Sequence, residues 1–197
     1  MKVHLIHGIH TGGPSWIQGF TPYLGPIVSV YPDYGWIAGL ETKVANPIIV
    51  GCLKPYIAPD DVLICHSNGC AIAYDLMNAG VKMAGAVFIN AALEQRIVRP
   101  PGVGWIDVYF NNGDDITEAA KVGAALGLTD KVWGEMGHAG YLGSDPNISN
   151  TDCTNGLPPL SGHSDMGTPA KFAAWGPHVV NAIHAHIART LHSEAYA

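Results

Sequence analysis

Short apolar runs alternate with longer, more polar stretches along this chain, and glycine, proline or acidic residues separate them. The runs that predict strands lie at residues 3–6, 27–31, 61–65, 84–90 and 105–110, with a short sixth at 131–133. The stretches that predict helices lie at residues 14–20, about 36–56, 70–78, 118–126 and 169–192. Continuous apolar strands that alternate with helices are typical of parallel sheets. The pattern predicts a doubly wound, mostly parallel α/β sheet of about six strands, with helices on both faces.

A long segment at residues 134–168, rich in Gly, Pro, Asn, Asp and Ser, separates the expected sixth strand from the last helix. Loops of that length are uncommon in compact domains unless they carry function, so we expect a functional loop here. Pro47 and Gly51 are expected to bend or divide the helix at 36–56. No repeat, charge block or low-complexity linker interrupts the chain. Residues 1–197 are therefore expected to form a single domain.

Length, composition and charge exclude several classes of protein. A chain of 197 residues is long enough to bury one hydrophobic core. Hydrophobic residues make up 48% of it but form no run near the roughly 18 residues that a membrane span needs. The net charge is -6 and the ten Lys and Arg residues are spread thinly, so no nucleic-acid partner is expected. No export signal is visible at the start, which favours a cytoplasmic location.

The four cysteines, Cys52, Cys65, Cys70 and Cys153, lack the spacing of a CxxC motif. Cys65 and Cys70 flank a segment that we assign to a strand, a tight turn and a helix. We expect buried thiols in a reducing compartment rather than a disulfide framework. A disulfide between Cys52 and Cys153 remains the alternative.

The segment at residues 62–73 is the most informative, because a buried strand is followed by a turn and then by a helix of small residues. Ser67 lies at the tip of that turn. This context is typical of a nucleophile elbow, in which a strained turn lifts a serine hydroxyl above the sheet. The usual pattern is GxSxG, and here Cys65 replaces the first glycine while Gly69 keeps the second. Cysteine is small enough for this position, and a serine in an ordinary turn is the alternative.

A serine nucleophile needs backbone N–H groups that stabilise the oxyanion of a tetrahedral intermediate. In an elbow the residue after the serine supplies one of them, which here is Asn68. The loop after the first strand reads His7-Gly8-Ile9, and two more glycines follow at positions 12 and 13. Because Gly8 permits a close approach of the backbone, the N–H of Ile9 is the candidate for the second donor, and an ordinary tight turn is the alternative.

A pair of carboxylates follows the strand at 105–110, in the turn that contains Gly113, Asp114 and Asp115. A carboxylate at the end of that strand can accept a hydrogen bond from a histidine ring and fix its tautomer. Asp114 is favoured, since Asp115 continues into the next helix. Asp115 remains the alternative acid, and capping that helix is the structural role open to one of the two.

Ten histidines are candidates for the general base, and chain order reduces them to two. With the order serine, acid, histidine, and with the histidine in the loop before the last helix, only His138 and His163 remain. His163 is favoured because the chain returns to the sheet just before that helix, and His138 is the alternative. The histidines of the final helix are expected on its solvated surface, and His66 is expected to point away from the reacting centre.

Together these motifs resemble the α/β hydrolase superfamily, in particular its small lipase-like and esterase-like members without a cap domain. The motifs that carry the resemblance are His7-Gly8-Ile9, residues 65–69, Gly113-Asp114 and Gly162-His163-Ser164, and they span nearly the whole chain. The segment at 133–141 is also similar to a group of small bacterial and phage-associated hydrolases, in which the histidine before the last helix is catalytic. Only about fifteen residues separate the fourth and fifth strands, so no helical cap is expected.

The resemblance implies a serine hydrolase that cleaves small-molecule carboxylic esters through an acyl-enzyme, with Ser67, His163 and Asp114 as its triad. It implies no cofactor, and no metal site is expected because HExxH or comparable ligand spacing is absent from the sequence. A thioester, an amide or an ester of a cell-envelope polymer is the alternative substrate, and a non-catalytic binding module on the same fold is less favoured. The aromatic candidates for an acyl pocket, each of which also fits core packing, are Trp16, Tyr34, Trp36 and Tyr141.

Overall fold

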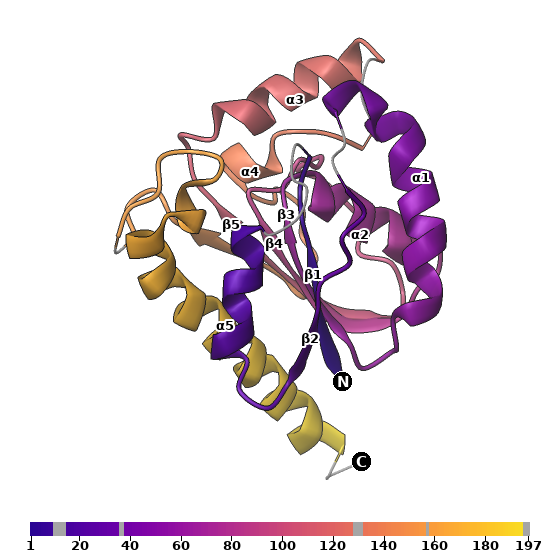
Figure 1. The fold of residues 1–197 in the computed structure, drawn as a ribbon, viewed down its shortest axis with the longest axis vertical. Helices are drawn as coiled ribbons and strands as arrows, with labels where there is room; N and C mark the ends of the chain where they lie inside the picture. Colours follow the sequence, from indigo (N-terminus) through magenta and orange to yellow (C-terminus); the bar gives the residue numbers. More distant parts are fainter. Residues whose placement is uncertain (10–14, 36–37, 128–131, 157, 195–197) are drawn as a thin grey trace.

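The strands form one six-stranded sheet in the computed structural model, which describes residues 1–9, 15–35, 38–127, 132–156 and 158–194 (Figure 1). Each strand runs parallel to its neighbours, in the order β2-β1-β3-β4-β5-β6. The strands are β1 (Lys2–Ile6), β2 (Val28–Val30), β3 (Val62–His66), β4 (Met83–Ile89), β5 (Val103–Phe110) and β6 (Ile148–Asp152). The first five begin and end within two residues of the apolar runs that predicted them. The predicted doubly wound α/β architecture is confirmed.

Helices cover both faces of this sheet. α5 and the 3-10 helix η1 lie on one side, and α1 and α2 lie on the other (Figure 1). The α-helices are α1 (Thr42–Leu53), α2 (Asn68–Asn78), α3 (Asp115–Ala125), α4 (Met136–Ala139) and α5 (Pro169–Glu194). The 3-10 helices are η1 (Trp16–Tyr23), η2 (Gly39–Glu41), η3 (Lys54–Tyr56) and η4 (Asp165–Gly167). The helix predicted at 36–56 is therefore shorter, and α1 runs through Pro47 and Gly51 without being divided by them.

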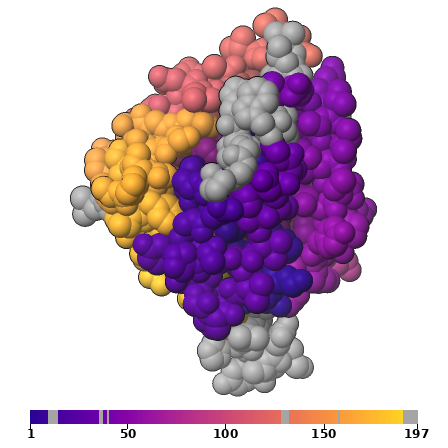
Figure 2. All heavy atoms as spheres, viewed as in Figure 1, coloured from indigo at the N-terminus to yellow at the C-terminus, as the bar shows by residue number. Residues whose placement is uncertain are grey.

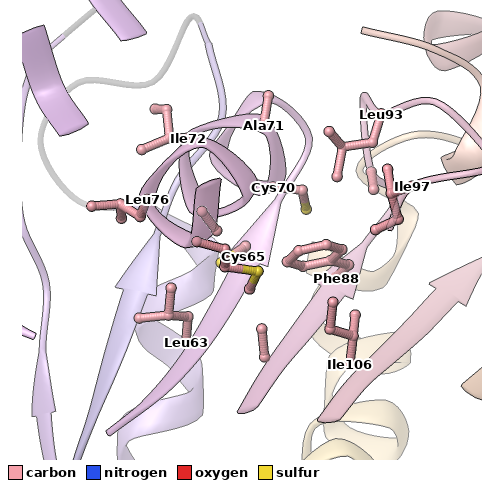
Figure 3. Close-up of a cluster of buried hydrophobic side chains, with 14 of the residues drawn as sticks. Leu63, Cys65, Cys70, Ala71, Ile72, Leu76, Phe88, Leu93, Ile97 and Ile106 are labelled. Carbon is pink, nitrogen blue, oxygen red and sulfur yellow. The ribbon is translucent and has the colours of Figure 1, made fainter. Parts of the chain in front are cut away.

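Alternate residues of the central strands pack into two hydrophobic clusters, one on each face of the sheet. Leu63 and Cys65 of β3 join a cluster with residues of α1 and α2, and Phe88 of β4 lies beside Cys65 in it (Figure 3). Val62 and Ile64 pack instead with η1 and α5. Every residue of β3 is buried because helices cover both of its faces.

The sixth strand is not where the sequence predicted it. Val132 and Trp133 are not part of a strand, and residue 131 lies outside the described residues. β6 falls instead inside the stretch predicted as a long loop, which also contains α4 and η4. β6 is the last strand in the sheet order, and Ile148 is its one buried residue. An edge strand of this kind is mostly polar, so apolar patterning does not detect it.

The order of the strands places the ends of β1 and β3 side by side at a topological switch point, since β2 lies beyond β1 and β4 beyond β3. Ligands of open α/β sheets bind at the carboxyl ends of strands at such a point. Ser67 follows β3 directly, and Gly8 lies in the loop after β1. In the space-filling view, the indigo N-terminal segment lies between the orange and yellow C-terminal part and the purple segment that includes α1 (Figure 2). Residues 90–102, between β4 and β5, contain no helix.

The cysteines and the helices test two further expectations. All four thiols are free, and Cys52 is exposed while Cys153 is buried, so the alternative disulfide between them is not formed. Cys65 and Cys70 are buried, as expected. Within the described ranges, no helix has the length and apolar character needed to cross a membrane.

A buried carboxylate ties the start of β1 to the start of β3. Asp61 accepts hydrogen bonds from the backbone N–H groups of Lys2 (2.6 Å) and Ala58 (2.9 Å), and its Oδ2 also lies 2.9 Å from His4 Nε2. Burial raises the pKa of Asp61, but these hydrogen bonds together outweigh burial, so its pKa lies below the ordinary value. The ionised carboxylate therefore stabilises the folded state.

Asp61→Asn is expected to lower the free energy of unfolding by about 2 kcal/mol near neutral pH, because buried hydrogen-bonding groups lose a charged partner. A carboxyl with a lowered pKa in the folded state stabilises above its unfolded pKa and loses that contribution as the pH falls through its folded pKa. The difference between wild type and variant should therefore shrink below about pH 3.9. Denaturant titrations on both sides of that pH measure it, and a constant difference would contradict this account.

Candidate active site

Ser67 stands between the end of β3 and the start of α2 in a backbone conformation that residues with side chains rarely adopt. Its φ is 57° and its ψ is -126°. A residue held in such a conformation stores about 1–3 kcal/mol, which the surrounding structure must offset. The N–H of Ser67 donates to the carbonyl of Ile89 (3.1 Å), and its carbonyl accepts from the N–H of Cys70 (3.0 Å). The turn has the geometry that the sequence predicted for a nucleophile elbow.

Two glycines let the end of β1 and the loop after it come close to this turn. A Cβ on Gly69 would overlap the carbonyl oxygens of Ile6 and His7. A Cβ on Gly8 would lie 2.9 Å from Ser67 Cβ, closer than two carbon atoms can approach without strain. The loop after β1 can therefore lie against Ser67 only because both side chains are missing.

Cys65, which replaces the first glycine of the usual GxSxG pattern, is a core residue. Its side chain is fully buried and lies beside Phe88 in the cluster under α2 (Figure 3). Burial raises the pKa of the Cys65 thiol well above its ordinary value, and the neighbouring Cys70 adds to this effect. Cys65 is therefore a small apolar packing residue rather than a reactive thiol.

The ring of His163 joins Ser67 to Asp114. Its Nε2 lies 2.7 Å from Ser67 Oγ, and its Nδ1 lies 2.9 Å from Oδ1 and 3.0 Å from Oδ2 of Asp114. The side chain of Asp114 is fully buried, and that of His163 is 10% exposed. Because Nδ1–H donates to the carboxylate, Nε2 carries the lone pair that faces the serine hydroxyl. The structure thus brings together in one hydrogen-bonded chain the three residues that the sequence named separately.

Asp114 has a second task, since it is also the N-cap of α3. Its Oδ1 accepts the backbone N–H of Thr117 (3.1 Å). Asp115, the alternative acid, is the first residue of the helix and is exposed. The capping role and the bond to His163 therefore fall on the same residue, and the start of α3 fixes the direction of the carboxylate.

His138, the alternative base, lies on α4 beside the carboxylates of α3. A ring nitrogen of His138 and a carboxylate oxygen from each of Asp115 and Glu118 lie within 4.8 Å of one another. The preceding residue, Gly137, lies against Asp114, since a Cβ on Gly137 would be 2.7 Å from Asp114 Oδ2. The hydroxyl of Ser67 is hydrogen-bonded to Nε2 of His163 and not to His138.

The side chain of Asn68 is held by two other buried residues. Asn68 and Asn46 of α1 exchange amide hydrogen bonds of 2.9 Å in both directions, and Trp133 Nε1–H donates to Asn68 Oδ1 (2.9 Å). These bonds fix the first residue of α2, whose backbone N–H is the candidate oxyanion donor. Sequence reasoning missed Asn46 and Trp133. The one available signal was an asparagine on the face of α1 that also carries Ile49 and Val50, since a buried polar side chain needs a partner.

Tyr34 contacts the loop after β1 through a hydrogen bond and a ring stack. The hydroxyl of Tyr34 donates to the carbonyl of His7, and the two rings stack with their centroids 3.9 Å apart. His7 Nδ1 lies 2.8 Å from the carbonyl of Gly8, and burial lowers the pKa of His7, which favours a neutral ring. Ile9, the candidate for the second N–H donor, follows this segment directly. Gly12 and Gly13 lie outside the described residues.

The aromatic candidates for an acyl pocket have different surroundings. Tyr34 supports the loop after β1, and Trp16 of η1 meets the ring of His66 edge-on at 5.0 Å. Tyr141 is buried in the core cluster under α1 and α2, so the packing alternative holds for it. Trp36 lies outside the described residues.

The expectation that His66 points away from the reacting centre is wrong. Its ring centroid lies 4.8 Å from that of His163, and its Nε2 lies 3.0 Å from the carbonyl of His163. The residue before the serine of an elbow can therefore reach the histidine loop when that loop passes over the end of β3. No local sequence pattern shows this contact, because 97 positions separate the two residues.

Known proteins resemble this chain in structure but not detectably in sequence. No protein-family model and no curated protein matches it. Alpha/beta hydrolase domain-containing protein 10 from mouse is 12% identical, with a TM-score of 0.60 over 93% of this chain and 90% of that one. Carboxylesterase CesB (YbfK) from Bacillus subtilis is 10% identical, with a TM-score of 0.51 over 94% and 83%.

A third similar structure is the type II thioesterase BorB from the borrelidin biosynthetic cluster, which is 12% identical with a TM-score of 0.50 over 94% of this chain and 92% of that one. At such low identities the likeness shows the fold alone. The chain has an α/β hydrolase fold, as the sequence predicted.

Gly69→Ala and Gly51→Ala are expected to change stability in opposite directions. Gly69→Ala should destabilise by about 1–3 kcal/mol, because its Cβ meets two backbone carbonyls that can move only with β1. Gly51 lies in α1 with no atom near its Cβ position, so Gly51→Ala should stabilise by about 0.5–1 kcal/mol. Denaturant titrations measure both, and equal stability of Gly69→Ala and wild type would contradict the close approach of β1.

Proposed function

We propose that this protein is a serine hydrolase that cleaves carboxylic esters through an acyl-enzyme intermediate. The observation that carries the proposal is the chain of hydrogen bonds from Asp114 through His163 to Ser67, with distances of 2.9 Å and 2.7 Å. A serine hydroxyl is a weak nucleophile unless a base takes its proton during the attack. The buried carboxylate holds the imidazole in the tautomer that can act as this base, and it stabilises the imidazolium that forms.

In the first half of the reaction, Ser67 Oγ attacks the carbonyl carbon of the ester while its proton moves to Nε2 of His163. The π electrons of the carbonyl move to its oxygen, which gives a tetrahedral intermediate. His163 then donates the proton to the alkoxy oxygen, the bond from carbon to that oxygen breaks, and the alcohol leaves. Ser67 now carries the acyl group as an ester.

In the second half, water takes the place of the alcohol. His163 removes a proton from the water as its oxygen attacks the acyl carbon, and a second tetrahedral intermediate forms. The proton passes to Ser67 Oγ, the acyl bond to serine breaks, and the carboxylic acid leaves.

The backbone N–H groups of Asn68 and Ile9 are the proposed oxyanion donors. Asn68 is the first residue of α2, and the first N–H groups of a helix lack intrahelical acceptors and favour negative charge. Ile9 follows Gly8, whose Cα lies against Ser67. One donor of this kind typically contributes about 10²–10³ to the rate.

An ester is the favoured substrate class because of the leaving group. Ester carbonyls are more electrophilic than amide carbonyls, and an alkoxide is a better leaving group than an amide anion. The similar structures include a carboxylesterase and a thioesterase, so a thioester is the substrate from which an ester must be distinguished. A panel of p-nitrophenyl esters of increasing acyl length, tested beside acyl-CoA thioesters and anilides, makes the distinction. Turnover of thioesters alone would replace the ester proposal.

Ser67→Ala and His163→Ala should each lower kcat for the best ester by at least about 10⁴-fold. Asp114→Asn should lower it by about 10³- to 10⁴-fold, because an amide oxygen still caps α3 but no longer stabilises the imidazolium. Steady-state kinetics on folded variants measures these effects.

Asp115→Asn and His138→Ala are the matched controls, and both should keep kcat within about threefold, within the spread that residues outside a catalytic unit show. A loss of activity in His138→Ala with none in His163→Ala would transfer the base to His138. A folded wild type that cleaves none of the acyl substrates would contradict the proposed function.

A further inference from the structure

The backbone that carries His163 lies outside the regular elements of the sheet. β6 ends at Asp152, and η4 begins at Asp165. Between them, residues 153–156 and 158–164 of the described chain belong to no helix or strand. The ring of His163 must nevertheless meet Ser67 and Asp114 at hydrogen-bonding distance at the same time, so something else has to fix its backbone.

Three buried side chains donate hydrogen bonds to two successive carbonyls of this segment. His66 Nε2 lies 3.0 Å from the carbonyl oxygen of His163. The Nδ2 groups of Asn90 and Asn111 donate to the carbonyl of Gly162, at 3.2 Å and 3.3 Å. His66 is the last residue of β3, Asn90 follows β4 and Asn111 follows β5. The ends of three adjacent strands thus hold one short piece of backbone.

Each donor is itself held in place. The ring of His66 meets Trp16 edge-on, and Trp16 packs on Gly167, where a Cβ would lie 2.5 Å from its ring. Asn90 has a φ of 46°, a conformation that asparagine tolerates better than most residues, and its N–H donates to the carbonyl of Tyr109 (2.9 Å). The N–H of Asn111 donates to the carbonyl of Gly137 (3.1 Å). The backbone of Asn90 and Asn111 and the ring of His66 are therefore fixed at the strand ends.

The chemistry of His66 suits this position beside a base that gains a proton. Its partner is a carbonyl oxygen, so Nε2 must carry the hydrogen. Burial, together with the neighbouring His163, lowers the pKa of His66 to about 3. His66 is therefore a neutral donor that adds no positive charge next to the imidazolium of His163.

We propose that His66, Asn90 and Asn111 are positioning residues that hold the backbone of Gly162 and His163, and so keep Nε2 of His163 on Ser67 Oγ. The inference rests on the proposed function, in which His163 is the base. It adds three residues that act through His163 without touching the substrate. Displacing a catalytic group by about 1 Å can cost on the order of 100-fold in rate, so the loss of one of these hydrogen bonds should have a measurable effect on the rate.

The test compares two substitutions of His66 that differ in the hydrogen-bond donor. His66→Phe keeps a ring against Trp16 and removes the N–H, whereas His66→Gln keeps an N–H near the position of Nε2. The readout is the rate constant for labelling of Ser67 by a fluorophosphonate probe, which requires the base but no identified substrate. We expect labelling to slow by about 10- to 100-fold in His66→Phe and by less than about threefold in His66→Gln. His184→Gln, an exposed change on α5, is the control and should label as wild type does.

A double-mutant cycle separates positioning from a general structural effect. A His163→Ala background lacks the imidazole that these hydrogen bonds position, so His66→Phe should slow the residual labelling no further. Asn90→Gly provides a second, independent variant, because glycine accepts the positive φ and removes the donor. It should slow labelling in the wild-type background and have no added effect without His163. Circular dichroism and denaturation midpoints identify variants that fold.

Several outcomes would overturn the inference. Folded His66→Phe and Asn90→Gly proteins that label at the wild-type rate would show that the hydrogen bonds from His66 and Asn90 are not needed to position His163. Equal slowing with and without His163 would show that they act on Ser67 or on the whole fold. A wild-type protein that is not labelled at Ser67 would refute the proposed function itself, whereas normal labelling of wild type with either of the first two results would refute only the positioning role.

Discussion

The structure depends on one strained turn, in which Ser67 connects β3 to α2 with a φ of 57°. The turn lifts the serine side chain off the end of the sheet, and it does so only where glycines at 8 and 69 leave room for β1 and its loop. Its strain of about 1–3 kcal/mol is small beside the burial of the two elements that it joins. All five residues of β3 are buried, and α2 has eight buried residues. Packing on both faces of the sheet therefore fixes the serine.

The polar groups around that turn form two linked layers of hydrogen bonds. The inner layer runs from Ser67 through His163 to Asp114, which α3 holds by its first turn. The outer layer fixes the backbone around the inner one. Asn46 and Trp133 hold the side chain of Asn68. The ends of β3, β4 and β5 supply hydrogen-bond donors to the carbonyls of Gly162 and His163. Buried polar groups of this kind are costly unless they are paired, so each bond also fixes the position of its partner.

Sequence patterns predicted the parts of this arrangement that local physics determines. Five strands were visible because buried parallel strands are continuously apolar, and Ser67 was visible because its strand, turn and helix are contiguous. β6 was missed because an edge strand reads as a polar loop, with Ile148 as its single buried residue. His66, Asn46 and Trp133 could not be assigned, since their partners lie far away in the chain. Asn90 and Asn111 offered a weak signal, because each is a polar residue directly after a buried strand.

The central claim is that Ser67, His163 and the N–H groups after β1 and at the start of α2 converge on one reacting carbon. A crystal structure of the protein after reaction with an alkyl fluorophosphonate tests it most directly, because the tetrahedral phosphorus stands in for the tetrahedral carbon of the intermediate. We expect a bond from phosphorus to Ser67 Oγ, with one phosphoryl oxygen about 2.7–3.1 Å from the backbone nitrogens of Asn68 and Ile9. An adduct on another residue, or a phosphoryl oxygen that faces solvent with neither N–H in reach, would contradict it.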